Sequence, residues 1–393
     1  MLSFDNTEIA FLSKSDKDLN RSYWLFKLVG SPRLVKAGKF FMELALKIGF
    51  PIKGIIKATI FRQFVGGENI EECGKIIADL GKFRIGTILD YSVEGKSTEA
   101  DFNSGCGEII QTILRGKADS NIPFSVFKVT GLAPFSLLEK VSAGSPLSAA
   151  EEVAWKKALE RVEQICRAAH EHKVPVFIDA EESWIQDAID QMADAMMEKF
   201  NKEEPIVYNT YQLYRHDRLA FLKTSLERAK AGGYFLGAKL VRGAYMEKER
   251  ARAEKLGYPS PIHADKASTD TDFDLALAFC MEHLDRIGFC AGTHNERSSM
   301  TLAKMLDEKG VSHADKRVYF SQLLGMSDHI SFNLADAGYN VAKYVPYGPV
   351  KEVLPYLIRR AMENTSVKGQ TGRELGLIIR EKQRRKEAKK KPD

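Results

Sequence analysis

Cysteine is scarce in this chain and follows no pattern. The 393 residues include five cysteines, at positions 73, 106, 166, 280 and 290, and no two of them are spaced as Cys-x-x-Cys. An odd, scattered set argues against a disulfide framework and against a cysteine-based zinc site. The sequence also lacks the His-Glu-x-x-His motif of a helical zinc site. We therefore expect a reducing compartment and no metal.

Long apolar runs are missing as well. The most apolar region, residues 40–61, is interrupted by Glu43, Lys47, Lys53 and Lys57, which excludes a membrane span there. The first twenty residues hold four acidic side chains and no continuous apolar stretch, so we expect neither a secretory nor a mitochondrial leader. These absences predict a cytoplasmic protein.

The chain has no Gly-x-Gly-x-x-Gly turn and no Gly-x-x-x-x-Gly-Lys-Ser/Thr loop, so neither common nucleotide-binding signature is present. It also has little excess charge, with 58 basic and 53 acidic residues and a net charge of +5. The last fourteen residues, 380–393, carry eight basic and three acidic side chains and account for all of it. Because the remainder is neutral, we expect no nucleic-acid partner.

What is present is the composition of a soluble globular protein, with 44% hydrophobic and 28% charged residues. Eight short β-rich runs alternate with charged, amphipathic stretches long enough for helices, which is typical of a (β/α)₈ barrel. A doubly wound open sheet is the rival architecture, but it normally uses fewer strands. The predicted strands are 84–91, 124–130, 174–179, 206–211, 234–241, 287–293, 317–322 and 341–345.

The pattern divides the chain into three parts. Residues 1–82 show apolar residues at helical spacing and predict a helical extension. Residues 83–379 hold the predicted barrel, and residues 380–393 form a basic tail. We expect the tail either to be a solvated end or to aid docking on anionic lipid.

In a barrel of this kind, polar residues at the carboxyl ends of the strands are candidates for the active site. Each also has a structural explanation: an aspartate can cap the next helix, and His294 can be a hydrogen-bonded supporting group. Lys128 and Lys239 stand inside apolar strands, where a lysine is costly unless it is paired. The candidates are Asp90, Glu94, Lys128, Thr130, Asp179, Glu181, Glu182, Asn209, Gln212, Lys239, Arg242, Thr293, His294, Asn295, Gln322, Tyr344 and Tyr347.

The segment after the last strand carries two adjacent arginines, Arg359 and Arg360, with Glu363 four residues after the first. Planar guanidinium groups suit a clamp for a carboxylate or a phosphate. A solvated pair on a surface helix explains them equally well. The clamp requires this helix to lie over the barrel mouth, the end where the carboxyl ends of the strands meet.

Several strings in this sequence are specific enough to indicate a family. They occur in order and at suitable spacing between about residues 61 and 364, and together they resemble the proline dehydrogenase family. The strings are Leu89-Asp90-Tyr91-Ser92, Ile178-Asp179-Ala180-Glu181-Glu182, Lys239-Leu240-Val241-Arg242-Gly243-Ala244-Tyr245, Thr293-His294-Asn295, Tyr344-Val345-Pro346-Tyr347-Gly348 and residues 356–364.

The resemblance implies a distorted (β/α)₈ barrel that binds FAD, with its eighth helix over the mouth. It implies that Asp179 and Lys239 act in catalysis. The residues it assigns to the cofactor are Ala180, Asn209, Lys239, Arg242, Gly243, Ala244, Thr293, His294 and Asn295. Those it assigns to the substrate are Lys128, Leu240, Tyr245, Tyr344, Tyr356, Arg359, Arg360 and Glu363.

The implied reaction is oxidation of L-proline to 1-pyrroline-5-carboxylate by hydride transfer to FAD N5, the first step of proline catabolism. The implied electron acceptor is a membrane quinone, which the protein would reach by peripheral attachment to the inner face of the membrane. A separate 1-pyrroline-5-carboxylate dehydrogenase would take the product, because the extra domains of bifunctional relatives are missing. Lys239 departs from the arginine that many bacterial relatives have there, which leaves the contact at flavin N5 open.

Three alternatives remain on sequence grounds. The chain could be a hydroxyproline dehydrogenase of the same family. It could be an aldolase barrel that forms a Schiff base on Lys128 or Lys239. It could also be a scaffold whose basic tail is the functional part, which would require the polar strand ends to be inert.

Overall fold

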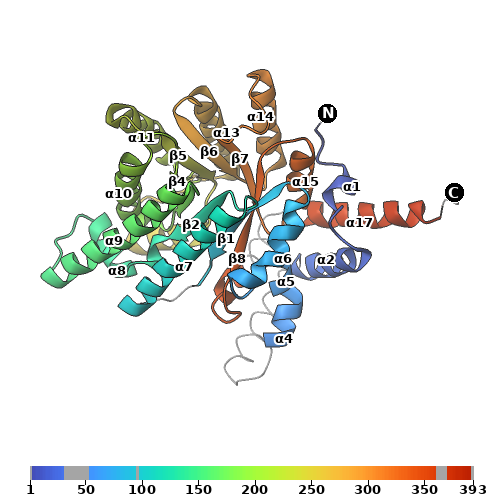
Figure 1. Cartoon of the computed structure of the whole chain (residues 1–393), viewed down its shortest axis with the longest axis horizontal. Helices are drawn as coiled ribbons and strands as arrows, with labels where there is room; N and C mark the ends of the chain where they lie inside the picture. Colours follow the sequence, from blue (N-terminus) through green and yellow to red (C-terminus); the bar gives the residue numbers. More distant parts are fainter. Residues whose placement is uncertain (1, 31–52, 94–96, 360–369, 391–393) are drawn as a thin grey trace.

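The computed structural model describes residues 2–30, 53–93, 97–359 and 370–390. Eight parallel strands close into a barrel in chain order, which confirms the predicted (β/α)₈ architecture (Figure 1). Each of the eight predicted runs overlaps one strand, and β4, β7 and β8 extend one or two residues beyond the predicted ends. The strands are β1 (Ile85–Tyr91), β2 (Phe124–Lys128), β3 (Val176–Asp179), β4 (Val207–Gln212), β5 (Leu236–Val241), β6 (Ile287–Gly292), β7 (Val318–Leu323) and β8 (Val341–Tyr347).

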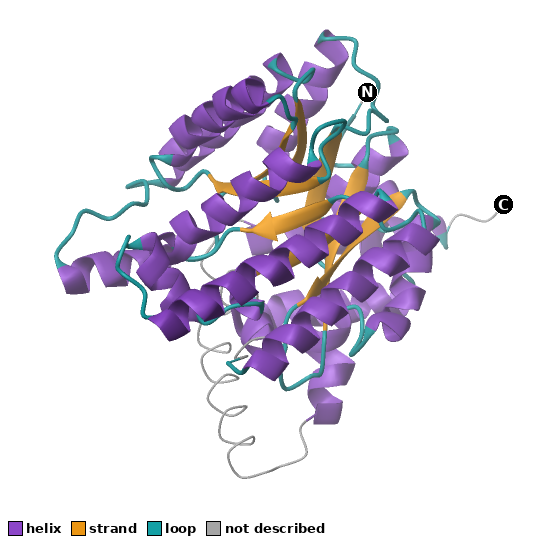
Figure 2. Cartoon of the chain, turned by 60° about the vertical axis from the view of Figure 1, so that its left-hand side comes forward, coloured by secondary structure: helices purple, strands orange, loops and turns teal. Residues whose placement is uncertain are grey.

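Helices surround the barrel, as Figure 2 shows. Polar caps fix where several of them begin: Ser148 and Thr98 each form a capping box with the carboxylate three residues later. The helices of the barrel region are α7 (Glu99–Ala118), η2 (Val129–Gly131), α8 (Phe135–Ser142), α9 (Ala149–His172), α10 (Ser183–Phe200), α11 (Arg218–Gly232), α12 (Met246–Leu256), α13 (Lys266–Glu282), α14 (Glu296–Glu308) and α15 (Asp328–Asp336). Residues 354–359 are helical as well.

The pleat of the strands separates two kinds of side chain. Those that point into the barrel form their own apolar cluster, which includes Phe124, Phe177, Tyr208 and Tyr344. Those that point outward join the larger core between barrel and helices. Because successive residues of a strand alternate between the two faces, position along a strand decides whether a polar residue faces the interior or the helices.

The chain ends pack together outside the barrel. The extension contains α1 (Thr7–Ala10), α2 (Asp16–Val29), α4 (Lys53–Ile56), the π-helical segment η1 (Lys57–Phe61), α5 (Arg62–Phe64) and α6 (Ile70–Gly81). Helix α17 (Gln370–Ala388) lies beside α2, with Phe26 and Leu377 in one apolar cluster. The predicted boundary at 379/380 therefore falls inside a helix. The three-part division of the chain stays a prediction.

The described ranges contain neither a membrane-spanning helix nor a cluster of metal ligands. Among residues 2–30, 53–93, 97–359 and 370–390, no helix is both long and apolar enough to cross a bilayer. The same ranges contain no group of three or more His, Cys, Asp or Glu side chains arranged to hold a metal ion. All five cysteines are buried as free thiols.

Candidate active site

Four charged side chains and a tyrosine meet at the mouth, all on inward-facing strand positions. Lys239 Nζ donates to Asp179 Oδ1 at 2.5 Å, and the Tyr344 hydroxyl donates to Asp179 Oδ2 at 2.6 Å. Lys128 Nζ lies 3.6 Å from Asp90 Oδ1 and 3.7 Å from Asp179 Oδ2. We call these five residues the mouth cluster. It brings together the two predicted catalytic residues and two of the predicted substrate residues.

Charge pairing dominates the protonation of the mouth cluster. Burial raises the pKa of Asp179, but Lys239 and Lys128 outweigh it and hold that pKa below its usual value. Burial lowers the pKa of Lys128, but Asp90 and Asp179 more than offset it, so that pKa lies above its usual value. The Lys239 ammonium also sits 4.6 Å from the centre of the Tyr344 ring. The cluster therefore holds Asp179 as a carboxylate and Lys128 as an ammonium.

Glu181 lies beside the mouth cluster, and its pKa is shifted in the opposite direction to that of Asp179. It is 4% exposed, and its carboxylate accepts bonds from the Thr130 backbone N–H at 3.1 Å and the Thr130 hydroxyl at 2.6 Å. Burial raises its pKa to about 7, against the opposing effect of these bonds. Sequence reasoning placed Glu181 at a strand end but gave it no role.

The segment 354–359 brings Arg359 to the mouth. The positive charge of Arg359 is close enough to lower the pKa of both Lys128 and Tyr245, although burial and nearby carboxylates have larger effects on each. Tyr356 is 6% exposed and packs in an apolar cluster with Phe61. The eighth helix thus begins over the mouth, as the fold prediction requires. Arg360 and Glu363 lie outside the described residues.

The ends of β5 and β6 form a second polar group beside the cluster. Arg242 donates from Nε to Asp270 at 2.7 Å, from Nη1 to Thr293 Oγ1 at 2.6 Å and from Nη2 to Ser298 Oγ at 2.9 Å. Gly243 follows with φ +136°, a conformation that disfavours any side chain, and a Cβ there would come within 2.4 Å of the Tyr214 ring. Ala244, the next residue, is exposed.

The two residues that follow Thr293 have visible structural partners. His294 Nδ1 lies 2.9 Å from Ser327 Oγ. Asn295 caps helix α14, where its side chain accepts from the Ser298 N–H at 3.1 Å. Ala180, at the turn after β3, is 8% exposed. Their predicted contacts with a cofactor stay predictions.

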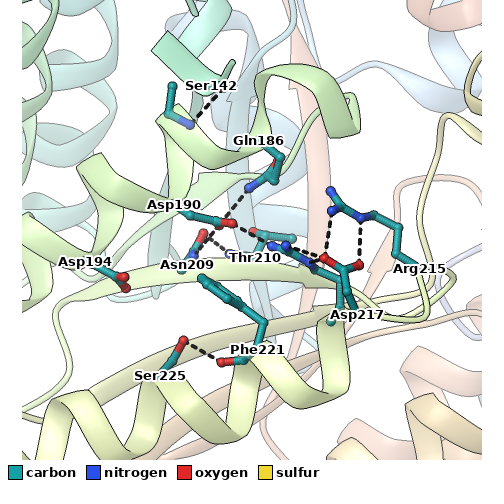
Figure 3. A network of polar contacts seen from close by, with 12 residues as sticks. Ser142, Gln186, Asp190, Asp194, Asn209, Thr210, Arg215, Asp217, Phe221 and Ser225 are labelled. Atoms are coloured by element: carbon teal, nitrogen blue, oxygen red, sulfur yellow. Dashed lines mark hydrogen bonds and ion pairs between the residues drawn. The ribbon is translucent and has the colours of Figure 1, made fainter. Parts of the chain in front are cut away.

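Two predicted site residues do not point into the barrel. Leu240 belongs to the outer core. Asn209 is fully buried and donates from Nδ2 to Asp190 Oδ1 at 2.9 Å, on helix α10 (Figure 3). The physical reason is the pleat, since Asn209 and Leu240 each neighbour an inward-facing residue. The structure therefore does not bring these two side chains into the mouth cluster.

Asp190 is the centre of a buried network behind β4 (Figure 3). Its Oδ2 pairs with Arg218 Nη1 at 2.6 Å, and its Oδ1 also accepts from Gln186 Nε2 at 2.9 Å. Gln186 Oε1 in turn accepts from the Glu181 backbone N–H at 2.9 Å. The network fixes the turn that follows Asp179 at the end of β3 and carries Glu181. Nothing in the sequence marks Asp190, one of three aspartates in the amphipathic helix α10.

Two further residues were missed, and both had a signal. Gln212 ends β4 on the inward face, 2% exposed, and its Oε1 has no hydrogen-bond partner among the described residues. It stood among the strand-end residues but received no role. Lys343 is a lysine inside an apolar strand, like Lys128 and Lys239, but it points outward and pairs with Asp328 at 2.9 Å.

The fold and the mouth cluster define a class of protein: a TIM-barrel enzyme that gathers cations and a fixed aromatic ring at its barrel mouth. The comparison with family models is more specific. The model described as "Proline dehydrogenase" matches residues 73–373. The chain belongs to the proline dehydrogenase family, which confirms the resemblance read from the sequence.

Individual relatives agree with this membership. The chain is 32% identical to "Proline dehydrogenase 1, mitochondrial" of Dictyostelium discoideum, over 98% of this chain and 75% of that protein. It is 31% identical to "Hydroxyproline dehydrogenase" of Xenopus laevis, over 98% of this chain and 90% of that protein. Across eight curated relatives the aligned region spans from 36% to 90% of the relative's own length.

The fold has counterparts among solved structures. Proline utilization A (PutA) from Bdellovibrio bacteriovorus, "inactivated by N-propargylglycine", matches with a TM-score of 0.72 and 20% identity. The match covers 92% of this chain but only 38% of that chain. At this identity the likeness supports the barrel fold, while family membership rests on the sequence.

Proposed function

We propose that this protein oxidises L-proline to 1-pyrroline-5-carboxylate with FAD as cofactor. L-proline would lose a hydride from the ring carbon next to nitrogen and a proton from nitrogen. The observation that carries the proposal is the mouth cluster with Arg359 beside it. Lys128, Lys239 and Arg359 supply three positive charges, whereas Asp90 and Asp179 supply two negative charges; Glu181 beside them, with a pKa of about 7, is partly protonated at neutral pH. A substrate carboxylate would neutralise the difference.

The contacts of Lys128 suit a binding role. Its distances of 3.6 and 3.7 Å to two carboxylates are longer than a charge-assisted hydrogen bond, so its N–H groups keep capacity for another anion. Arg359 offers a planar fork for the same carboxylate. Holding the carboxylate at two or more points orients the proline ring, so that its reacting carbon is kept close to the hydride acceptor.

Asp179 is better suited to hold the site in shape than to react. Each of its oxygens is engaged, one by Lys239 and one by the Tyr344 hydroxyl. These bonds fix the Tyr344 ring as a wall and the Lys239 ammonium as a charge. Asp179 would therefore orient both partners and keep them oriented while the substrate exchanges.

The residues at the ends of β4 to β6 fit FAD. A buried Gln212 Oε1 without a described partner can accept from an N–H of the ring system. Lys239 and Arg242 can compensate negative charge there, and Gly243 allows close approach of the backbone to a ligand. Bound FAD would supply the two-electron acceptor at its N5. The fit of the donors supports FAD without locating it.

The aldolase alternative loses support. A Schiff-base lysine must be deprotonated to attack, whereas the carboxylates around Lys128 hold its pKa above the usual value. Lys239 is engaged by Asp179. Membership of the proline dehydrogenase family points the same way. The alternative of a scaffold with a functional basic tail is also unsupported, because the charged side chains at the strand ends contact one another at the barrel mouth.

The electron acceptor and the next enzyme follow from the proposed reaction. The reduced cofactor would pass electrons to a membrane quinone, and a separate 1-pyrroline-5-carboxylate dehydrogenase would consume the product. The names of several relatives include "mitochondrial". The cytoplasmic location of this chain, with peripheral attachment to a membrane, stays a prediction.

Anaerobic titration with proline tests the proposal. The purified protein should show flavin absorbance that bleaches as L-proline is added, with 1-pyrroline-5-carboxylate formed in equal amount. The Arg359→Met variant should keep its flavin and need far more proline for the same bleaching. A protein that binds FAD but is not reduced by proline would contradict the proposed substrate.

A further inference from the structure

The turn between β7 and α15, residues 324–327, connects the barrel mouth with the helices at the chain ends. Gln63, in α5, donates from Nε2 to Gly325 O at 3.0 Å. Lys343 donates to Met326 O at 2.6 Å from the outer face of β8. The N–H of Ser327 donates to Glu374 Oε1 on α17. Segments far apart in sequence thus hold one turn.

Ser327 occupies an unusual conformation within this turn. Its φ of 51° and ψ of 40° are left-handed, which is unfavourable for a residue with a Cβ. The residue is fully buried, and Glu374, which accepts its N–H, is 4% exposed. Burying that N–H without an acceptor would be costly. Glu374 therefore stabilises the backbone conformation that Ser327 needs.

The conformation aims the Ser327 hydroxyl at the site. Ser327 Oγ lies 2.9 Å from Nδ1 of His294, the second residue after β6 at the mouth. The neighbouring Thr293 is held by the same region: Gln322 Nε2 donates to Thr293 O at 3.1 Å, and Ser331 Oγ donates to Gln322 Oε1 at 2.7 Å. Both residues after β6 are thus fixed from the side of this turn.

We propose that Ser327 is a positioning residue for the cofactor: its hydroxyl sets the orientation of the His294 ring, and Glu374 holds Ser327 in place. The inference rests on the proposed function, because it takes His294 as a residue that contacts FAD. It gives α17 a role in cofactor binding although α17 lies outside the barrel. Truncating or loosening α17 would weaken FAD binding without removing any residue of the mouth cluster.

Titration of the apoprotein with FAD, followed by flavin fluorescence, tests the proposal without relying on turnover. Ser327→Gly removes the hydroxyl and also relieves the left-handed backbone, so the variant should fold. We expect its Kd for FAD to rise about fivefold, the effect of one hydrogen bond. Ser299→Ala is the matched control, because Ser299 is a buried serine whose Oγ has no hydrogen-bond partner among the described residues. Its Kd should equal that of the wild type.

A double-mutant cycle shows whether Ser327 acts through His294. If it does, Ser327→Gly should change the Kd much less in a His294→Ala background than in the wild type. Equal effects in both backgrounds would overturn the proposal, since a general structural role would persist without His294. Rescue tests Glu374: Glu374→Gln keeps an acceptor and should retain wild-type affinity, whereas Glu374→Ala should resemble Ser327→Gly.

Failure of this inference and failure of the proposed function give different results. If the wild-type apoprotein does not bind FAD, the proposed function is wrong. If it binds FAD and is reduced by proline, but Ser327→Gly binds with unchanged Kd, the positioning role is wrong and the function stands.

Discussion

The two faces of the barrel wall bury charges in different ways. On the outer face, the pairs Asp190–Arg218 and Asp328–Lys343 are held at 2.6 and 2.9 Å. On the inner face, Lys239 is paired with Asp179 at 2.5 Å, but Lys128 has two carboxylates only at 3.6 and 3.7 Å and stays partly exposed. In each outer pair, close ion pairing offsets the desolvation of both charges. At the mouth, Lys128 has no partner at hydrogen-bonding distance in the described part of the chain and can bind another anion. The contrast separates structural from functional charges that look alike in sequence.

Replacing a lysine by methionine on each face gives the largest expected difference, both in the free energy of unfolding and in activity. Lys343→Met leaves Asp328 buried without its closest partner and should lower the free energy of unfolding by about 3 to 5 kcal/mol. Lys128→Met should lower that free energy less, because Asp179 keeps Lys239 and Tyr344 as partners and Asp90 keeps the Ser92 hydroxyl, and it should lower kcat/KM for proline sharply. Denaturant unfolding and steady-state kinetics on both variants measure this. Equal loss of stability in both would remove the distinction between the faces.

Arg359 should affect substrate binding and little else. Arg359→Met removes the proposed charge-assisted contact with the substrate carboxylate, which costs about 2 to 4 kcal/mol of transition-state binding. We expect that loss mainly as a higher KM for proline, with unchanged flavin content. Arg62→Met, at a side chain that is 66% exposed, serves as control. An unchanged KM would place Arg359 outside the site.

Two buried carboxyls, Glu181 beside the mouth cluster and Asp328 outside the barrel wall, should contribute to stability with opposite pH dependence. Burial raises the pKa of Glu181 from 4.5 to about 7, so its contribution to stability is complete below pH 4.5 and is lost as pH rises through about 7. Lys343 and Lys14 overcome the burial of Asp328 and lower its pKa from 3.8 to about 2. The stability from Asp328 is therefore present above pH 3.8 and is lost only as pH falls through about 2.

Stability measured between pH 5 and 8 distinguishes the contribution of Glu181 from that of Asp328. The Glu181→Gln variant should gain stability relative to the wild type as pH rises, on the order of 2 kcal/mol across the range. The Asp328→Asn variant should show a constant loss. Urea unfolding at several pH values measures both, and parallel curves for wild type and Glu181→Gln would show that Glu181 has an ordinary pKa.

Tyr344 tests the wall of the mouth cluster. The hydrogen bond from the Tyr344 hydroxyl to Asp179 fixes the tyrosine ring as a wall. Against this wall the extra hydroxyl of 4-hydroxyproline would lose its water without gaining a partner, which costs about 1 to 3 kcal/mol of binding free energy. We expect proline to be preferred by about ten- to a hundredfold in kcat/KM. Tyr344→Ser should narrow the ratio. Equal efficiencies in the wild type would favour the hydroxyproline assignment.

How far the sequence leads is clear from the lysines. Periodicity and strand count predict the barrel, and the order of strand-end residues predicts the mouth cluster. A lysine within an apolar strand predicts a buried partner, but not on which face, so Lys128 and Lys343 are indistinguishable until the pleat is known. The outward direction of Asn209 has the same cause. Asp190 and Ser327 act through contacts between distant segments, which no local pattern encodes.

The basic end of the chain carries the smallest expected effect. Arg385 and Lys389 of the segment 380–393 pair with Asp16 of α2, while Lys386 has no ion pair among the described residues. Each basic residue near an anionic bilayer contributes about 1 kcal/mol at most. Removing residues 386–393 should weaken binding to anionic liposomes at low salt and not at high salt. Identical binding by both forms would leave this end without a role in docking.

The most direct test of the whole account is the absorption spectrum of the purified protein before and after anaerobic addition of L-proline. The account predicts flavin bands that bleach with proline and a cofactor that acid precipitation releases, because no covalent link is expected. It also predicts that Lys128→Met retains the bands but bleaches only at much higher proline concentration. A colourless wild-type protein that folds and cannot take up FAD would contradict the central claim.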